Sequence, residues 1–70
     1  MMTIMISNIA GGNAKIYRLL RGGGIPDAAI RHARSLRSTF GGWQCSDPNA
    51  AERIEQYLEA RWPVEDKQRS

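Results

Sequence analysis

Three clusters of glycine divide this 70-residue chain into short segments, and they constrain its fold more than any other feature. The clusters are Gly11-Gly12, Gly22-Gly23-Gly24 and Gly41-Gly42. Adjacent glycines interrupt helices and strands, because ordering their backbone costs more entropy than ordering any other residue. A chain of this length buries only about 60% of its unfolded surface. We therefore expect a single small domain over residues 1–70, assembled from short elements.

The segment 26–40 is predicted to form a helix. Pro26 suits the first helical position because its missing N–H would have no partner there, and Asp27 favours the positive end of the helix dipole. Apolar residues recur at the spacing of one buried helical face: Ala29, Ala33, Leu36 and Phe40. The small alanines in this stripe predict that another helix approaches closely.

A second helix is predicted over residues 48–62, followed by a polar tail over residues 63–70. Asn49 and Glu52 have the spacing of a capping box, while Asp47 with Pro48 is a competing start. The expected inward stripe consists of Ile54, Tyr57, Leu58 and the stem of Arg61, and the expected acidic outer face of Glu52, Glu55 and Glu59. Because Pro63 disfavours helical geometry in the residue before it, Trp62 is the expected last helical residue.

The beginning of the chain is less regular. Residues 1–12 alternate weakly through Ile4 and Ile6, which leaves three alternatives: a partly ordered arm, the start of a helix, or a strand paired with a second copy. Residues 13–21 are predicted to form a short helix capped by Asn13. Together these segments predict an all-α fold, a small three-helix domain with a short N-terminal arm or strand.

A single histidine and a single cysteine exclude most catalytic and metal chemistry. Cys45 has no second cysteine with which to form an internal disulfide or a cysteine-rich zinc site. His32 lies at the edge of the apolar stripe, and no nucleophile or carboxylate stands at a spacing that would make it catalytic. We therefore expect a protein that is not an enzyme and that uses neither a metal nor a cofactor.

The net charge of +3 conceals an uneven distribution. Residues 1–40 hold six basic residues and one acidic residue, whereas residues 41–70 hold four basic and six acidic residues. The basic half favours an anionic partner, either nucleic acid or an acidic protein surface; equally, the two halves attract each other within one chain or across a dimer. Arginine and tryptophan dominate binding hot spots. The candidate partner-binding residues are therefore Arg18, Arg21, Arg31, Arg34 and Trp43.

The stretch Leu19–Arg34 resembles a helix-turn-helix DNA-binding unit. Gly24 followed by Ile25 is similar to the Gly-apolar pair in the turn of that family, and Ile30 and Ala33 fall where its second helix packs inward. The resemblance implies that residues 26–40 are the recognition helix. It places Asp27, Ala28, Arg31 and His32 at base edges, and Lys15, Arg18, Arg21 and Arg34 at phosphates.

In its small size, its basic charge and its lack of catalytic motifs, the chain also resembles the accessory proteins of phages and mobile elements. Such proteins cover the surface of a host immune effector or transcription regulator. We therefore expect a non-enzymatic protein that masks a host protein or protein complex, as a homodimer because so small a core is marginal alone. The alternative is a helix-turn-helix regulator that binds DNA. No run approaches the roughly 18 apolar residues of a membrane span, so a cytoplasmic protein without a membrane partner is expected.

Overall fold

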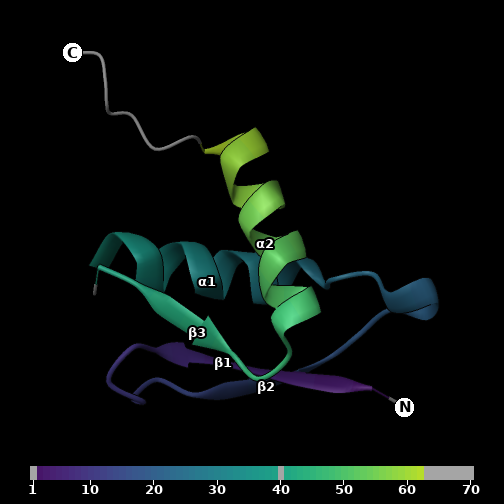
Figure 1. Ribbon diagram of the computed structural model, residues 1–70, viewed down its shortest axis with the longest axis horizontal. Helices are drawn as coiled ribbons and strands as arrows, with labels where there is room; N and C mark the ends of the chain where they lie inside the picture. Colours follow the sequence, from purple (N-terminus) through teal and green to yellow (C-terminus); the bar gives the residue numbers. More distant parts are fainter. Residues whose placement is uncertain (1, 40, 63–70) are drawn as a thin grey trace.

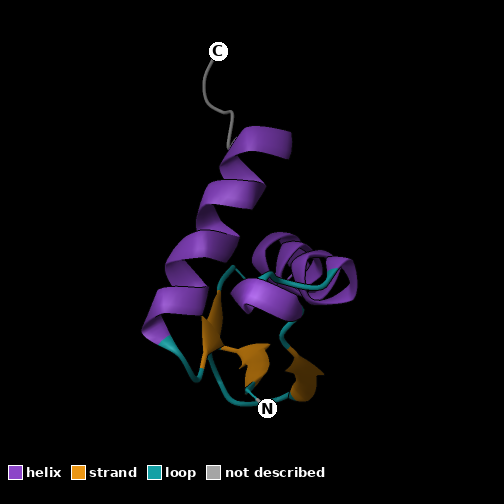
Figure 2. Ribbon diagram, turned by 90° about the vertical axis from the view of Figure 1, so that its right-hand side faces the viewer, coloured by secondary structure: helices purple, strands orange, loops and turns teal. Residues whose placement is uncertain are grey.

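The computed structural model describes residues 2–39 and 41–62. The elements are, in chain order, β1 (Thr3–Asn8), β2 (Lys15–Arg18), the 3-10 turn η1 (Arg21–Gly23), α1 (Asp27–Thr39), β3 (Trp43–Cys45) and α2 (Pro48–Arg61). The strands form one antiparallel sheet in the order β2-β1-β3. Both helices lie on the same side of this sheet and cross each other (Figures 1 and 2). The fold is therefore a two-layer α+β arrangement.

The all-α prediction is wrong, because the predicted helix over residues 13–21 is absent. Lys15–Arg18 is a strand that pairs with β1, with Ile4 opposite Tyr17. The three residues of β3 pair with the other side of β1, where Ile6 lies opposite Cys45. Residues 1–12 do contain a strand, in agreement with one of the three alternatives, but its partners belong to the same chain.

A tight connection explains why Lys15–Arg18 forms a strand instead of part of a helix. Asn8 and Gly12 join the two ends of the turn: the Asn8 backbone N–H donates to the Gly12 carbonyl at 3.0 Å, and the Gly12 N–H donates to Asn8 Oδ1 at 2.7 Å. Gly11 has a φ of 95° and Asn13 a φ of 54°. These are left-handed conformations that glycine and asparagine tolerate best. Asn13 therefore reverses the chain in this turn instead of capping a helix.

The helices predicted over residues 26–40 and 48–62 are confirmed as α1 and α2. At the start of α2, Asp47 Oδ1 accepts from the Asn49 N–H at 3.1 Å and Pro48 follows, so the helix uses this start and not the capping box. The last helical residue of α2 is Arg61, one residue before the predicted end, and Trp62 is the C-cap. Neither described helix is long and apolar enough to cross a membrane. The predicted core residue Phe40 and the tail 63–70 lie outside the described residues.

The core lies between the sheet and the helices, and its buried apolar residues are Ile4, Ile6, Ile25, Ala29, Ile30, Ala33, Leu36, Ala50, Ile54 and Leu58. These residues confirm the predicted stripe of α1 at Ala29, Ala33 and Leu36, and that of α2 at Ile54 and Leu58. In contrast, Tyr57 is 39% exposed and Arg61 is exposed, so the prediction that Tyr57 and the stem of Arg61 belong to the inward stripe is wrong.

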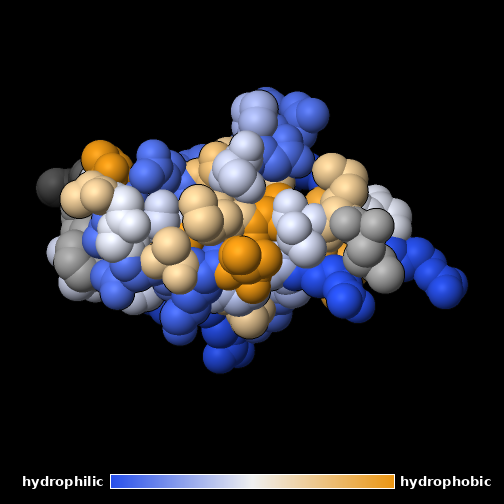
Figure 3. All heavy atoms as spheres, turned by 90° about the horizontal axis from the view of Figure 1, so that it is seen from below, coloured by the Kyte–Doolittle hydropathy of each residue, from blue (hydrophilic) through white to orange (hydrophobic). Residues whose placement is uncertain are grey.

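No helix of the described residues covers the other face of the sheet. Strand side chains alternate between the two faces, so Met5 and its partner Ile16 point away from the helices. Both are exposed, Met5 at 42% and Ile16 at 71%. Viewed from this side, apolar side chains lie among polar and charged ones (Figure 3).

Candidate functional site

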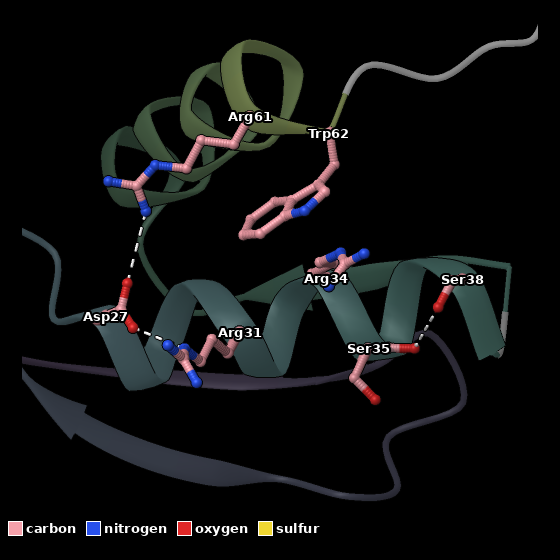
Figure 4. A pocket seen from close by; sticks show the side chains of 7 residues that line it. All are labelled: Asp27, Arg31, Arg34, Ser35, Ser38, Arg61 and Trp62. Atoms are coloured by element: carbon pink, nitrogen blue, oxygen red, sulfur yellow. Dashed lines mark hydrogen bonds and ion pairs between the residues drawn. The ribbon is translucent and has the colours of Figure 1, made fainter.

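An open groove of about 760 Å³ runs between the outward face of α1 and the C-terminal end of α2. Seven residues line it: Asp27, Arg31, Arg34, Ser35 and Ser38 from α1, with Arg61 and Trp62 from the end of α2 (Figure 4). The α1 residues recur at three- and four-residue spacing, which places them on one side of the helix. That side is opposite the buried stripe of Ala29 and Ala33, so the packing of the core turns these polar residues toward α2 and solvent.

Each arginine of the groove is held by a neighbouring side chain. Arg31 Nε donates to Asp27 Oδ2 at 2.6 Å, and Arg61 Nη1 donates to Asp27 Oδ1 at 3.5 Å. The guanidinium carbon of Arg34 lies 4.2 Å from the centre of the Trp62 ring. A guanidinium has five N–H donors, so these contacts fix the orientation of each group while donors remain for an external anion. Three cations against one carboxylate make the groove positive.

The arrangement continues along α2 on the same side. Arg61 lies over the ring of Tyr57, with 5.6 Å between its guanidinium carbon and the ring centre. One helical turn before Tyr57, Arg53 Nη1 donates to the Gly23 carbonyl at 2.7 Å, which ties α2 to the η1 turn. We call the following set the arginine–aromatic surface: Arg31, Arg34, Arg53, Tyr57, Arg61 and Trp62.

A different side of α2 is acidic. Glu52, Glu55 and Glu59 recur at helical spacing and are exposed, as predicted. Two of them bind the rest of the protein: Glu59 forms an ion pair with Arg37 at 3.3 Å, and Glu55 Oε2 accepts from Trp43 Nε1 at 3.0 Å. The helix therefore separates an acidic side from the arginine–aromatic surface.

Only two of the five predicted partner-binding residues line the groove. Arg31 and Arg34 lie together in the groove. Arg18 is exposed on β2 and Arg21 is exposed in η1, and neither lines the groove. Trp43 is half-buried in β3, packs against the core and does not line the groove.

Arg53, Tyr57, Arg61 and Trp62 were missed as binding residues. The predicted inward stripe includes Tyr57 and Arg61, and Trp62 is predicted only as the end of the helix. The sequence signal that identifies this surface is the recurrence of Arg53, Tyr57 and Arg61 every four residues, beside the acidic stripe and not within the apolar one.

The helix-turn-helix resemblance does not extend to the structure. Its first helix is missing, because the residues before Asp27 form β2 and the η1 turn. Of the predicted DNA-contacting residues, Asp27 already pairs with Arg31 and Arg61, while Ala28 is exposed in the first turn of α1. Lys15 is part of β2, and His32 packs against Tyr17 of that strand, so neither residue lines the groove. Residues 19–34 therefore do not form the two helices of that unit.

His32 packs against β2 as a structural residue. Its ring centre is 5.8 Å from that of Tyr17, and its Nδ1 atom is buried without a hydrogen-bond partner. Burial lowers the pKa of His32, and the charge of Lys15 lowers it further, while the Asn13 backbone acts in the opposite direction. Burial also raises the pKa of Tyr17. Burial therefore favours the neutral form of both rings.

This contact predicts a loss of stability in weak acid. Since the folded pKa of His32 lies below its ordinary value of 6.5, the unfolded chain takes up the proton first. The contribution to stability is present above pH 6.5 and is lost as the pH falls from there through the folded pKa. Urea denaturation at about pH 7.5 and about pH 5 should show a lower midpoint in acid, and His32→Gln should reduce that difference. An unchanged difference in the variant would show that carboxylates alone are responsible.

Within the described ranges, no three His, Cys, Asp or Glu side chains lie close enough together to hold a metal ion. Cys45 is a free thiol on β3 and is half-buried. Comparison with protein families, curated proteins and solved structures found no match for this chain. Its function therefore has to be inferred from the arginine–aromatic surface itself.

Proposed function

We propose that this protein is a non-enzymatic binding protein that masks a larger protein by docking its arginine–aromatic surface onto an acidic patch of that partner. The observation that carries the proposal is the groove in which Asp27 orients Arg31 and Arg61 and in which Trp62 holds Arg34. Arginine, tryptophan and tyrosine are the residue types in which interface binding energy concentrates. All six members of the surface belong to these three types.

The orientation of the arginines supports binding because it reduces the entropy lost on association. Immobilising a long side chain at an interface costs about 0.5–1.5 kcal/mol. Arg34 on Trp62 and Arg61 on Tyr57 are already restrained in the free protein. Their remaining N–H donors form a fork that matches a carboxylate in two parallel hydrogen bonds. An acidic protein surface presents such carboxylates.

A protein partner fits this charge pattern better than a nucleic acid does. Double-stranded DNA presents one negative charge per roughly 1.7 Å of helix axis, which favours a continuous basic surface. Here Asp27 lies inside the groove, and the exposed carboxylates of Glu52 and Glu59 occupy another side of α2. Such a mixed pattern complements a partner with both acidic and basic residues.

The proposed partner is a host immune effector or transcription regulator, which a small phage protein would meet in the cytoplasm. In this proposal the domain covers a functional surface of its partner, and the groove is the part of the described chain that anchors it. Catalysis is not proposed, because His32 packs against Tyr17 and the described pocket beside Cys45 is lined by Met5, Ser7, Gln44 and Ser46, none of which is a general base.

The test compares two double variants that remove the same charge. Arg31→Ala with Arg34→Ala changes the groove, whereas Arg18→Ala with Arg21→Ala changes β2 and η1. Each immobilised variant is offered host lysate, and a protein captured by the wild type is then titrated against all three. Loss of about 2 kcal/mol or more at a hot-spot residue would weaken binding by the groove variant at least roughly 30-fold, while the β2 variant binds as the wild type does.

If both double variants bound the captured protein equally weakly, the proposal would be contradicted, since the groove would then contribute only through its positive charge. Fluorescence anisotropy with a labelled DNA duplex is the second arm. Tight DNA binding that weakens steeply with salt and depends on Arg31 and Arg34, without any captured protein, would replace masking with nucleic-acid binding.

A further inference from the structure

The outer edge of β2 has backbone groups that no strand of the described chain pairs. β2 stands at the end of the sheet order β2-β1-β3. The Leu19 N–H donates to the Met2 carbonyl at 3.0 Å, which fixes the alternation of the antiparallel ladder. Lys15 and Tyr17 therefore turn their backbone groups toward β1. The N–H and C=O groups of Ile16 and Arg18 point outward, and the Ile16 side chain is 71% exposed.

We propose that this edge pairs with the same edge of a second copy, antiparallel and around a two-fold axis at Ile16. The two three-stranded sheets would join into one continuous sheet of six strands. This inference does not depend on the proposed function, because the residues of the arginine–aromatic surface belong to α1 and α2 and to the cap of α2, whereas the edge belongs to β2. The groove residues drawn in Figure 4 come from the two helices.

The sequence of β2 is complementary to itself in this register. Ile16 lies opposite Ile16 of the second copy, and both residues use their outward backbone groups in hydrogen bonds. Lys15 then lies opposite Tyr17 of the second copy, and Arg18 opposite its Ala14, so no two like charges face each other directly. A register centred on Tyr17 would instead place Ile16 against Arg18 and separate the isoleucines.

The open face of the sheet supports a second copy as the occupant. Met5 lies beside Ile16 in the register and is 42% exposed, so the apolar surface at the edge continues onto β1. An edge strand with exposed apolar side chains is prone to uncontrolled pairing. A two-fold contact pairs the β2 edge of each copy once, so no β2 edge remains free for a third copy.

The oligomeric state tests the inference. Sedimentation equilibrium over a concentration series should give the mass of a dimer for the wild type. Ile16→Lys places two ammonium groups opposite each other at the two-fold axis and should give a monomer. Ile9→Lys is the matched control, because Ile9 is 65% exposed but lies against Gly42, near the β3 side of the sheet. A wild type that stays monomeric throughout, or an Ile16→Lys variant that stays dimeric, would overturn the proposal.

Cross-linking tests the register without disturbing the edge by charge. The Cα atoms of a hydrogen-bonded antiparallel pair lie about 5.5 Å apart, within the roughly 4.4–6.8 Å that a disulfide spans. In a Cys45→Ser background, Ile16→Cys should therefore give a disulfide-linked dimer on mild oxidation. Arg18→Cys should not, because its two copies would be offset by roughly 14 Å along the strands. Efficient linking through Arg18→Cys, or none through Ile16→Cys, would refute this pairing.

Discussion

Replacing Ile6 by alanine should lower the free energy of unfolding by about 2–5 kcal/mol. Ile6 lies on the middle strand β1 and is 0% exposed, on the face that both helices cover. The substitution removes three carbon atoms from the core. Because β1 is paired with β2 on one side and β3 on the other, the surroundings cannot move in to fill the space, and a cavity remains. Small domains have little stability in reserve. A substantial fraction of the variant should therefore be unfolded at 37 °C.

Urea denaturation followed by circular dichroism measures this effect, and Ile9→Ala is the control. Ile9 lies three residues further along the same segment, but its side chain is 65% exposed. Surface substitutions of this kind change stability by about 0.5 kcal/mol or less. If both variants lost the same stability, the face of β1 that we assign to the core would be wrong.

The two helices were predictable because their signals are local. Residues 27–39 and 48–61 each contain several turns, so the helical period repeats often enough to separate it from alternation. Pro26 and Asp47-Pro48 also mark the two starts. Every one of these signals lies within the helix that it specifies or directly before it. The burial of Ala29, Ala33 and Leu36 was predictable for the same reason, because their spacing within one helix places them on one face.

The sheet was not predictable in this way because its strands are short and depend on distant residues. The four residues of β2 are too few to distinguish a period of 2 from one of 3.6. Ile16 and Tyr17 favour strands, but pairing with β1 decides the outcome. β3 is shorter still, and it is held by contacts with β1 that include Gln44 Nε2 donating to the Asn8 carbonyl at 3.2 Å.

The candidate site was likewise predictable only in part, where its signals are local. Arg31 and Arg34 lie on the face of α1 opposite its apolar stripe, so periodicity alone predicts their exposure. Whether they meet Arg61 and Trp62 depends on the angle at which α2 crosses α1. That angle follows from the packing of buried residues far apart in the sequence. Periodicity within either helix contains no information about it.

Replacing the buried Ala33 by glutamate should lower the free energy of unfolding by more than about 4 kcal/mol. Ala33 is 0% exposed, on the face of α1 that packs against the sheet and α2. A glutamate side chain does not fit into a space filled by a methyl group, and its carboxylate would be buried without a partner. We expect no folded protein by circular dichroism or by amide dispersion in NMR spectra.

Ala28→Glu is the matched control, since it introduces the same side chain into the same helix. Ala28 is exposed and lies in the first turn of α1, beside the positive end of the helix dipole. A carboxylate there should stabilise the helix by about 0.3–1 kcal/mol at low salt. Two identical substitutions on one helix are thus expected to have effects of opposite sign, because one meets the core and the other meets water. A folded, stable Ala33→Glu protein would contradict the packing of α1 on the sheet, and with it the orientation of the face that presents Arg31 and Arg34.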